Sequence, residues 1–309
     1  MSILRFLILG LRSIMSDKRV YIYDCTLRDG AQTQGVDFNA TDKALISEEL
    51  DRLGVDYIEG GWPGANDTDD AFFDSLPKLK TARFSSFGMT RRAGRSSDND
   101  PGLNAILSTN AQVATIFGKT WDFHVDVALE IDHDENIEMI RDSVQHATSK
   151  VNEVIFDAEH FFDGYKANPE FALSCLKAAD EGGARWIVLC DTNGGTLPHE
   201  ITDIVNAVKI HIPGSKLGIH CHDDTGNAVA NSLAAVQAGV RQVQGALNGL
   251  GERCGNANLI TIIPSLILKM GYETGISNDN LKYLSYVSRI LDEHLNRAPN
   301  RNAPYVGES

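Results

Sequence analysis

The sequence predicts a (β/α)8 barrel, in which eight parallel strands close on themselves inside a ring of helices. Eight short apolar runs alternate along the chain with eight segments whose apolar residues recur every three or four positions, as in strands followed by packing helices. The length of 309 residues also fits a single barrel. An open, doubly wound sheet is the alternative, but it usually has a glycine-rich phosphate loop after its first strand. Gly249, Gly251 and Gly255, near the end of the chain, do not form that motif.

The expected strands are short runs rich in β-branched and aromatic residues that end in polar turns. In chain order they are 20–25, 57–60, 83–87, 113–117, 153–156, 186–190, 217–221 and 242–246. The expected helices are 41–53, 68–78, 101–109, 135–149, 168–181, 198–211, 226–239 and 256–269. The first helix shows the helical period well, because its apolar stripe excludes Lys43 and includes Leu45, Ile46, Leu50 and Leu53.

Prolines and glycines mark several helix ends. Pro169 and Pro198 fall in expected first turns, where the missing N–H of proline costs no helical hydrogen bond. Gly54, Gly182 and Gly239 follow expected helices, and each is expected to adopt the left-handed conformation common at helix C-termini.

A ninth helix is expected at 279–296, followed by a tail without helical or strand periodicity. We therefore expect a disordered or mis-assigned N-terminal extension at 1–18, a catalytic barrel at 19–275, and a C-terminal helix with the start of a linker at 276–309. The apolar segment 1–14 is shorter than the roughly 20 residues that span a bilayer, and no other stretch approaches that length.

Composition narrows the classes of partner and compartment. The formal net charge of −14 disfavours nonspecific nucleic-acid binding and docking on anionic membranes, so neither is an expected partner. The five cysteines are irregularly spaced and form no Cys-x-x-Cys pair, which favours the reducing cytoplasm.

His220 and His222 are the strongest candidates for metal ligands. They lie two residues apart at the end of an expected strand, so both imidazole rings project from one face. Neutral imidazole is the commonest protein ligand for divalent transition metals. An isolated His-x-His is more often a pair of core residues, so the metal interpretation depends on which residues lie nearby.

Polar residues follow the carboxyl ends of five expected strands, where the active sites of (β/α)8 enzymes lie. Each group alone is weak evidence, because Arg-Asp pairs and Asp-Thr-Asn turns are common on surfaces. Their convergence on one barrel mouth favours a shared function. The groups contain Arg28, Asp29 and Gln32; Glu159; Thr192; His220 and His222; and Asn256.

Two histidines and one carboxylate make a three-ligand site with open coordination positions. Asp29 is the candidate carboxylate, because the first strand closes a barrel beside the last. Such a site accepts Mn²⁺, Mg²⁺, Zn²⁺ or Co²⁺ and leaves room for a chelating substrate such as a 2-oxo acid. Arg28, adjacent in sequence, is placed to stabilise developing negative charge.

Three motifs, DCTLRDGAQTQ (24–34), HCHDDTG (220–226) and NGLGERCGNA (248–257), resemble those of metal-dependent Claisen-condensing enzymes. This family comprises the isopropylmalate, homocitrate and citramalate synthases and is related to hydroxymethylglutaryl-CoA lyase. The resemblance extends from Val20 to the end of the chain. The citramalate synthase branch is favoured by the segments YIEGGWPGAN (57–66), FGMTRR (87–92) and FDAEHFFDGYK (156–166).

By matching position, the resemblance implies that Asp29, His220 and His222 bind the metal. It also implies that Asn256 is an additional ligand or a residue just behind the ligands. Arg28 is implied to steady the enolate or the keto oxygen.

Substrate positioning is implied for Gln32, Glu159 and Thr192, with Thr192 holding the oxo-acid carboxylate. The implied reaction joins acetyl-CoA, as co-substrate, to pyruvate and water, giving (R)-citramalate and CoA. Glu159 is a candidate for the base that removes the acetyl proton, and it could equally hold the substrate. A homodimer is also implied.

Family members continue past the barrel into a subdomain that closes over the active site, and this chain stops about where that subdomain would begin. We therefore expect the metal site to be intact in this chain. Whether the chain catalyses the reaction is left open. The alternatives are an isopropylmalate or homocitrate synthase, a related acyl-CoA lyase, or a barrel that binds metal and oxo acid without turnover.

Other residues near strand ends are expected to have structural or secondary roles. Packing, rather than nucleophilic chemistry, is expected for Cys25, Cys190 and Cys221. Structural roles are also favoured for His124 and His160. Trp62 is expected to line the pocket, and either CoA phosphates or a solvated loop would account for Arg91, Arg92 and Arg95.

Overall fold

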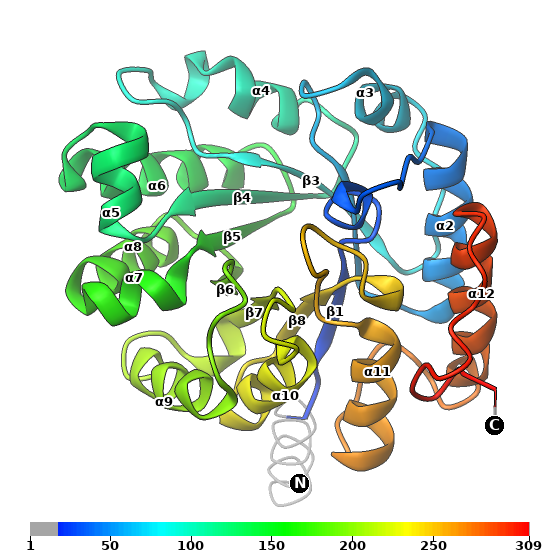
Figure 1. Cartoon of the computed structure of the whole chain (residues 1–309). Helices are drawn as coiled ribbons and strands as arrows, with labels where there is room; N and C mark the ends of the chain where they lie inside the picture. The colour runs from blue at the N-terminus through cyan, green and yellow to red at the C-terminus, as the bar shows by residue number, and fades with distance from the viewer. Residues whose placement is uncertain (1–17, 309) are drawn as a thin grey trace, which may run out of the picture.

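The computed structural model describes residues 18–308, which form a closed barrel of eight parallel strands. Strand order around the barrel follows the chain, and β8 pairs with β1 to close it. Figure 1 shows the helices arranged outside the strands. The predicted barrel is confirmed, with strands β1 Tyr21–Asp24, β2 Tyr57–Gly61, β3 Arg83–Met89, β4 Val113–Lys119, β5 Glu153–Glu159, β6 Trp186–Asp191, β7 Leu217–Cys221 and β8 Gln242–Gly245.

All the expected helices are present, most of them shorter than predicted. They are α2 Ala40–Leu53, α3 Asp67–Asp74, α4 Pro101–Leu107, α6 His133–Thr148, α8 Pro169–Glu181, α9 Pro198–Val208, α10 Ala228–Ala238, α11 Leu259–Pro264 and α12 Leu284–His294. The helix expected at 256–269 starts later because Asn256 and Asn258 form backbone bridges with His222 and Ala246. After Pro264 its last turn is a π-helix, Ser265–Lys269.

Two short helices, α5 Asp122–His124 and α7 Phe161–Ala167, were not predicted. Both lie at carboxyl ends of strands, and neither is long enough to show a helical period. A turn of 3-10 helix, Gly30–Gln32, also follows β1 and begins directly after Asp29. These segments place polar residues around the barrel mouth.

Two of the three expected left-handed glycines are confirmed. Gly54 has a φ of 105° and Gly239 a φ of 117°. Gly182 was predicted wrongly: its φ is −66°, and the next residue, Gly183, has a φ of 96°. Helical geometry therefore continues through Gly182, and the reversal needed to enter β6 falls on the second glycine.

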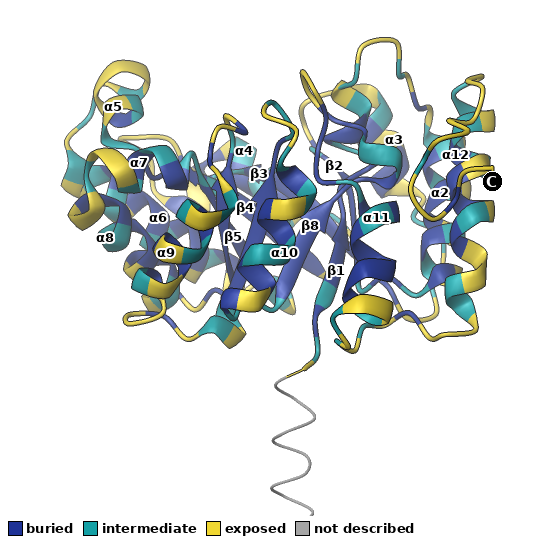
Figure 2. Cartoon of the chain, turned by 60° about the horizontal axis from the view of Figure 1, so that its bottom comes forward, coloured by how far each residue is buried: buried dark blue, intermediate teal, exposed yellow. Residues whose placement is uncertain are grey.

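The barrel interior contains a chain of hydrogen-bonded polar side chains, although apolar residues fill the layer between strands and helices. The Tyr23 hydroxyl donates to Glu59 Oε2 at 2.6 Å and lies 2.8 Å from Thr115 Oγ1. Thr115 Oγ1 is in turn 2.8 Å from Ser85 Oγ. In Figure 2 the strands are buried and most exposed residues lie on the outer faces of helices and in loops. These interior groups support the floor of the barrel mouth.

The stripe predicted for the first helix was partly wrong. Lys43 is buried, at 3% exposure, whereas Leu45 is 46% exposed. The Lys43 ammonium pairs with the Asp69 carboxylate and donates to the Gly60 carbonyl at 2.9 Å. Asp69 Oδ2 also accepts hydrogen bonds from the Trp62 backbone N–H and the Asn66 amide. This buried ion pair joins α2 to α3.

Replacing Lys43 with methionine is expected to destabilise the fold by about 3–5 kcal/mol, because Asp69 would keep a buried charge without its cation. Urea unfolding measures the loss. Lys282→Met is the matched control, since the Lys282–Asp279 pair is exposed and exposed pairs contribute only about 0–1 kcal/mol. Equal effects of the two substitutions would contradict the structural role of the Lys43–Asp69 pair.

Residues near both ends of the described chain contact the rest of the protein. Most of the extension predicted at 1–18 lies outside the described residues, and Arg19 already forms a bridge with Glu273. At the other end, α12 packs against α2, and Tyr305 of the tail lies 3.1 Å from Ser265 by its hydroxyl. None of the helices within residues 18–308 is both long and apolar enough to cross a membrane.

Candidate active site

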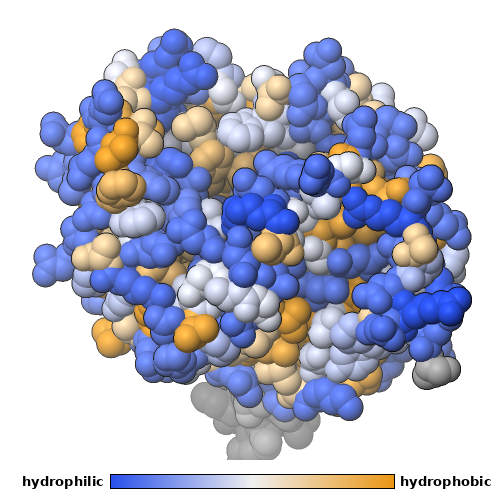
Figure 3. Space-filling view, viewed as in Figure 1, coloured by the Kyte–Doolittle hydropathy of each residue, from blue (hydrophilic) through white to orange (hydrophobic). Residues whose placement is uncertain are grey.

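A cavity of about 200 Å³ lies at the carboxyl ends of the strands. Most of the candidate residues line it, and Asn256 lies behind Asp29. Hydrophilic residues dominate the face seen in Figure 3, with apolar groups scattered among them. The cavity is lined by Arg28, Asp29, Gln32, Trp62, Phe87, Phe117, Asp157, Glu159, Cys190, Thr192, His220, His222 and Glu252.

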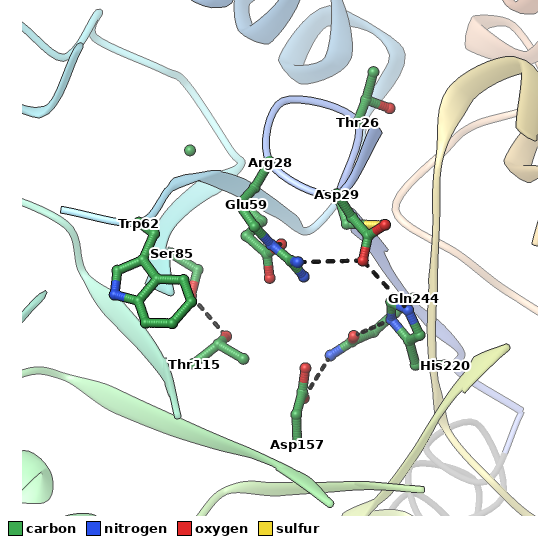
Figure 4. Close-up of polar contacts among 12 residues, drawn as sticks. Thr26, Arg28, Asp29, Glu59, Trp62, Ser85, Thr115, Asp157, His220 and Gln244 are labelled. Carbon is green, nitrogen blue, oxygen red and sulfur yellow. Dashed lines mark hydrogen bonds and ion pairs between the residues drawn. The ribbon is translucent and has the colours of Figure 1, made fainter. Parts of the chain in front are cut away.

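Asp29, His220 and His222 converge on one point of the cavity wall, and their ligand atoms all lie within 4.8 Å of one another. The two histidine Nε2 atoms are 3.3 Å apart, and Asp29 Oδ2 is 3.8 Å from His220 Nε2. Two nitrogens bound to one ion at about 2.1 Å, at angles between tetrahedral and octahedral values, lie roughly 3.0–3.4 Å apart. The three side chains therefore fit a shared divalent cation. Figure 4 shows two of them, Asp29 and His220, facing each other.

The charge states of these side chains also suit a metal. Burial opposes ionisation of Asp29, but Arg28 and the two histidines outweigh it and hold the pKa of Asp29 below its usual range. Burial, followed by the neighbouring His220, lowers the pKa of His222 to about 3. At neutral pH the structure thus presents a carboxylate and a neutral imidazole, the forms that bind metals.

Asn256 is joined to His222 by a backbone bridge. Its Nδ2 donates to Asp29 Oδ1 at 2.8 Å, which leaves Asp29 Oδ2 directed towards His220. Its own Oδ1 is buried and has no hydrogen-bond partner among the described residues. Buried polar atoms are normally paired, so this oxygen is a candidate for an additional metal ligand.

Arg28 is held on three sides by neighbouring side chains, and Figure 4 shows it between Glu59 and Asp29. Its Nε donates to Glu59 Oε1 at 2.5 Å, Nη1 lies 3.2 Å from Asp29 Oδ2, and the guanidinium stacks 3.7 Å over Phe87. Burial opposes its charge, but Glu59 and then Asp29 outweigh this and raise the pKa of Arg28 above its usual value. A fixed cation therefore lines the cavity.

The other candidate residues occupy the rim and the opposite wall. Glu159 ends β5 and pairs with Lys119 at 2.5 Å. Thr192 Oγ1 accepts the His160 backbone N–H at 2.9 Å, so its own hydroxyl proton remains available to a ligand. His160 adopts a left-handed φ of 56°, which turns the chain towards Thr192. Gln32 is exposed at the rim.

Sequence reasoning assigned no role to four residues that shape this site: Glu59, Asp157, Gln244 and Phe117. Glu59 and Gln244 are polar residues within predicted strands, and such residues indicate a polar barrel interior. Asp157 belongs to the motif quoted above, where only Glu159 was given a role. Burial, followed by Glu59, raises the pKa of Asp157 to about 8.

The structure also places the tryptophan, cysteine and arginine residues for which structural or secondary roles were predicted. Trp62 lines the cavity as expected, and Cys25 and Cys221 are fully buried. Cys190 lines the cavity, but burial and then Asp157 raise the pKa of its thiol. Arg91 does not lie free for CoA phosphates, because it is buried against Glu135 and Asp142.

His124 and His160 stack edge to face at 4.4 Å and are absent from the cavity lining. Both rings also contact Trp121. This aromatic cluster on the loops after β4 and β5 agrees with the structural roles favoured for both histidines. Arg92 and Arg95 are exposed, and nothing in the structure connects them to the cavity.

Comparison with known proteins agrees with the predicted resemblance. An (R)-citramalate synthase of Aquifex aeolicus is 53% identical over 94% of this chain and 56% of its own length. The chain thus spans about half the length of such curated relatives. A 2-isopropylmalate synthase of Sulfolobus acidocaldarius is 34% identical over 90% of this chain and 69% of its own length.

A solved structure shows a similar fold, and a family profile shows the family. The hydroxymethylglutaryl-CoA lyase of Pseudomonas aeruginosa shares the fold, with a TM-score of 0.76 at 18% identity over 93% of this chain and 96% of the lyase. The profile described as HMGL-like matches residues 19–287, a range that includes all of the barrel predicted at 19–275. The chain belongs to the HMGL-like family.

Proposed function

We propose that this chain forms the catalytic barrel of an enzyme that joins acetyl-CoA to pyruvate, giving (R)-citramalate and CoA. The observation on which this depends most is the Asp29, His220 and His222 donor set beside the Arg28 cation in one small cavity. The names of the relatives support the same chemistry, and those at 46–53% identity are (R)-citramalate synthases.

Asp29, His220 and His222 would hold a divalent cation, with Asn256 Oδ1 as an additional ligand. When bound, the cation supplies Lewis-acid polarisation of the keto carbonyl of the oxo acid. The nitrogen and oxygen donors suit Mn²⁺, Mg²⁺, Zn²⁺ or Co²⁺. The family resemblance predicts a homodimer, and light scattering would measure its molecular mass.

The protein's own groups position the two substrates. Arg28 would donate hydrogen bonds to the oxygen on which negative charge develops, and its ion pairs keep it in place. The free hydroxyl proton of Thr192 would donate to the carboxylate of the oxo acid. Gln32 would contact substrate at the rim of the cavity.

The reaction balances without an oxidant or reductant. The acetyl methyl group loses a proton, its carbon bonds to the keto carbon, and the keto oxygen gains a proton. Water then cleaves the thioester, and CoA leaves as a free thiol. We propose Glu159, which lies in the cavity wall beside Lys119, as the group that contacts the acetyl moiety and accepts the proton.

Three aromatic rings close one side of the cavity and favour a small oxo acid. Phe87 and Phe117 stack at 5.3 Å between ring centroids, and Trp62 meets both rings edge-on. This rigid wall would limit the size of the oxo-acid side chain. We therefore propose pyruvate, whose side chain is one methyl group, as the preferred oxo acid.

Replacing Phe117 with alanine is therefore expected to raise kcat/KM for 2-oxoisovalerate relative to pyruvate. The change should be roughly tenfold or more, because one methylene in an apolar pocket is worth about 1–3 kcal/mol of discrimination. Phe123→Ala, which removes a 52% exposed ring of the same kind, is the control. An unchanged ratio in Phe117→Ala would place the substrate side chain elsewhere.

The proposed function is tested by incubating the protein with Mn²⁺, acetyl-CoA and a panel of 2-oxo acids while titrating released thiol. The assay is run on this chain and on a protein of its relatives' full length. We expect thiol release with pyruvate and (R)-citramalate as the product. Preference for 2-oxoisovalerate or 2-oxoglutarate, or cleavage of an acyl-CoA, would favour the alternatives. Pyruvate binding without turnover in both proteins would favour a non-catalytic barrel.

A further inference from the structure

We propose that Gln244 is a positioning residue that fixes the tautomer of His220 so that its Nε2 is free to bind metal. Asp157 anchors Gln244 in the required orientation. The proposal rests on the proposed metal site and adds two residues, from β8 and β5, to which that site gives no role.

The three side chains form a continuous chain of hydrogen bonds across the barrel interior (Figure 4). Gln244 is fully buried, and its Cα lies opposite that of His220 in the β7–β8 register. His220 Nδ1 lies 2.8 Å from Gln244 Oε1. Gln244 Nε2 donates to Asp157 Oδ1 at 3.0 Å. The amide of Gln244 therefore has a partner at each end.

Hydrogen-bond chemistry decides which nitrogen of His220 has the proton. Asp157 Oδ1 is an acceptor as a carboxylate, and it remains one in the acid when the proton is on Oδ2. In the structure the NH2 group of Gln244 faces Asp157 Oδ1, and its carbonyl oxygen faces His220. That oxygen can only accept, so His220 Nδ1 must be protonated and Nε2 keeps its lone pair.

The lone pair of His220 Nε2 faces the other candidate metal ligands. His220 Nε2 is the atom that lies 3.3 Å from His222 Nε2 and 3.8 Å from Asp29 Oδ2. His222 has no equivalent support, because its buried Nδ1 has no hydrogen-bond partner within the described part of the chain. Of the two rings, His220 is therefore the one whose tautomer and orientation the protein determines before metal arrives.

The test compares Gln244→Leu with Gln244→Glu and with a matched control, Gln242→Leu. Gln242 is also fully buried on β8, two residues away, but it makes no hydrogen bond to His220. One readout is the tautomer of His220 in metal-free protein, measured from the nitrogen shifts of ¹⁵N-labelled histidine and assigned with His220→Ala. The other readout is Mn²⁺ affinity by calorimetry.

In the wild type, we expect the Nδ1–H tautomer of His220 before any metal is added. Gln244→Leu should shift His220 towards the Nε2–H tautomer and weaken Mn²⁺ binding roughly 10–100-fold, the usual effect of losing such a partner. Gln244→Glu should restore both, because the introduced carboxyl shares a proton with Asp157 and still accepts from Nδ1. Gln242→Leu should change neither readout.

An Nε2–H tautomer in the wild type would overturn the proposal. So would wild-type affinity and tautomer in Gln244→Leu, or an equal loss in Gln242→Leu. Neither readout requires turnover, so a protein that fails the condensation assay can still confirm the role of Gln244. The tautomer measurement does not require metal, which separates it from failure of the metal site itself.

Discussion

Replacing His222 with alanine is expected to abolish tight Mn²⁺ binding and, with it, condensation. The substitution removes one of the three convergent ligands, so the loss of affinity should exceed the roughly 10–100-fold that removal of an outer partner costs. Asp29 and His220 remain, and they provide only two of the three ligands. Calorimetry with Mn²⁺ measures the affinity, and thiol release measures the rate.

His211→Ala is the matched control, since His211 is exposed and lies outside the cavity. It should bind Mn²⁺ as the wild type does. Thermal unfolding of both variants shows whether the fold is retained. Wild-type affinity in His222→Ala would refute the assignment of the metal site and the function that depends on it.

The same substitution has an expected effect on acid stability in metal-free protein. His222 has a folded-state pKa of about 3, whereas an unfolded histidine titrates near about 6.5. Between these values the unfolded chain binds the additional proton, so the unfolding free energy rises with pH and is lost as pH falls. His222→Ala should flatten this part of the profile in urea unfolding. An unchanged slope would indicate that His222 is protonated normally.

Replacing Arg28 with lysine is expected to lower kcat by roughly 10²–10³, the usual cost of removing one fixed donor to a developing oxyanion. Lysine keeps the positive charge beside Glu59 and Asp29. It cannot reproduce the planar guanidinium, which contacts both carboxylates while stacking on Phe87. Mn²⁺ affinity should change little, because Arg28 is not among the ligands.

Arg83→Lys is the matched control for this prediction. Arg83 stacks 4.5 Å over Tyr57 and pairs with Glu153 at 2.5 Å, so it repeats the arrangement of Arg28 outside the cavity. We expect near-normal kcat in Arg83→Lys. Equal losses in the two variants would show that the effect of Arg28→Lys is structural. Normal kcat in Arg28→Lys would exclude Arg28 from the reaction.

Much of the candidate site could be predicted because its residues lie at ends of strands with clear apolar patterns. The two-residue period of β7 was enough to place His220 and His222 on one face. Barrel closure was enough to place Asp29 near them, since β1 pairs with β8. The buried Lys43 was missed because an isolated charge on an apolar stripe shows nothing of its partner, Asp69.

The alternation of strands and helices, the family and most of the side chains at the barrel mouth could be predicted without a structure. They follow from short-range periodicity and from motifs whose residues are close together in the chain. The folded barrel was needed to show that Glu59 supports Arg28 and that Gln244 lies between His220 and Asp157. Such contacts join different strands, and they depend on register and side-chain direction around a closed sheet, which no local pattern specifies.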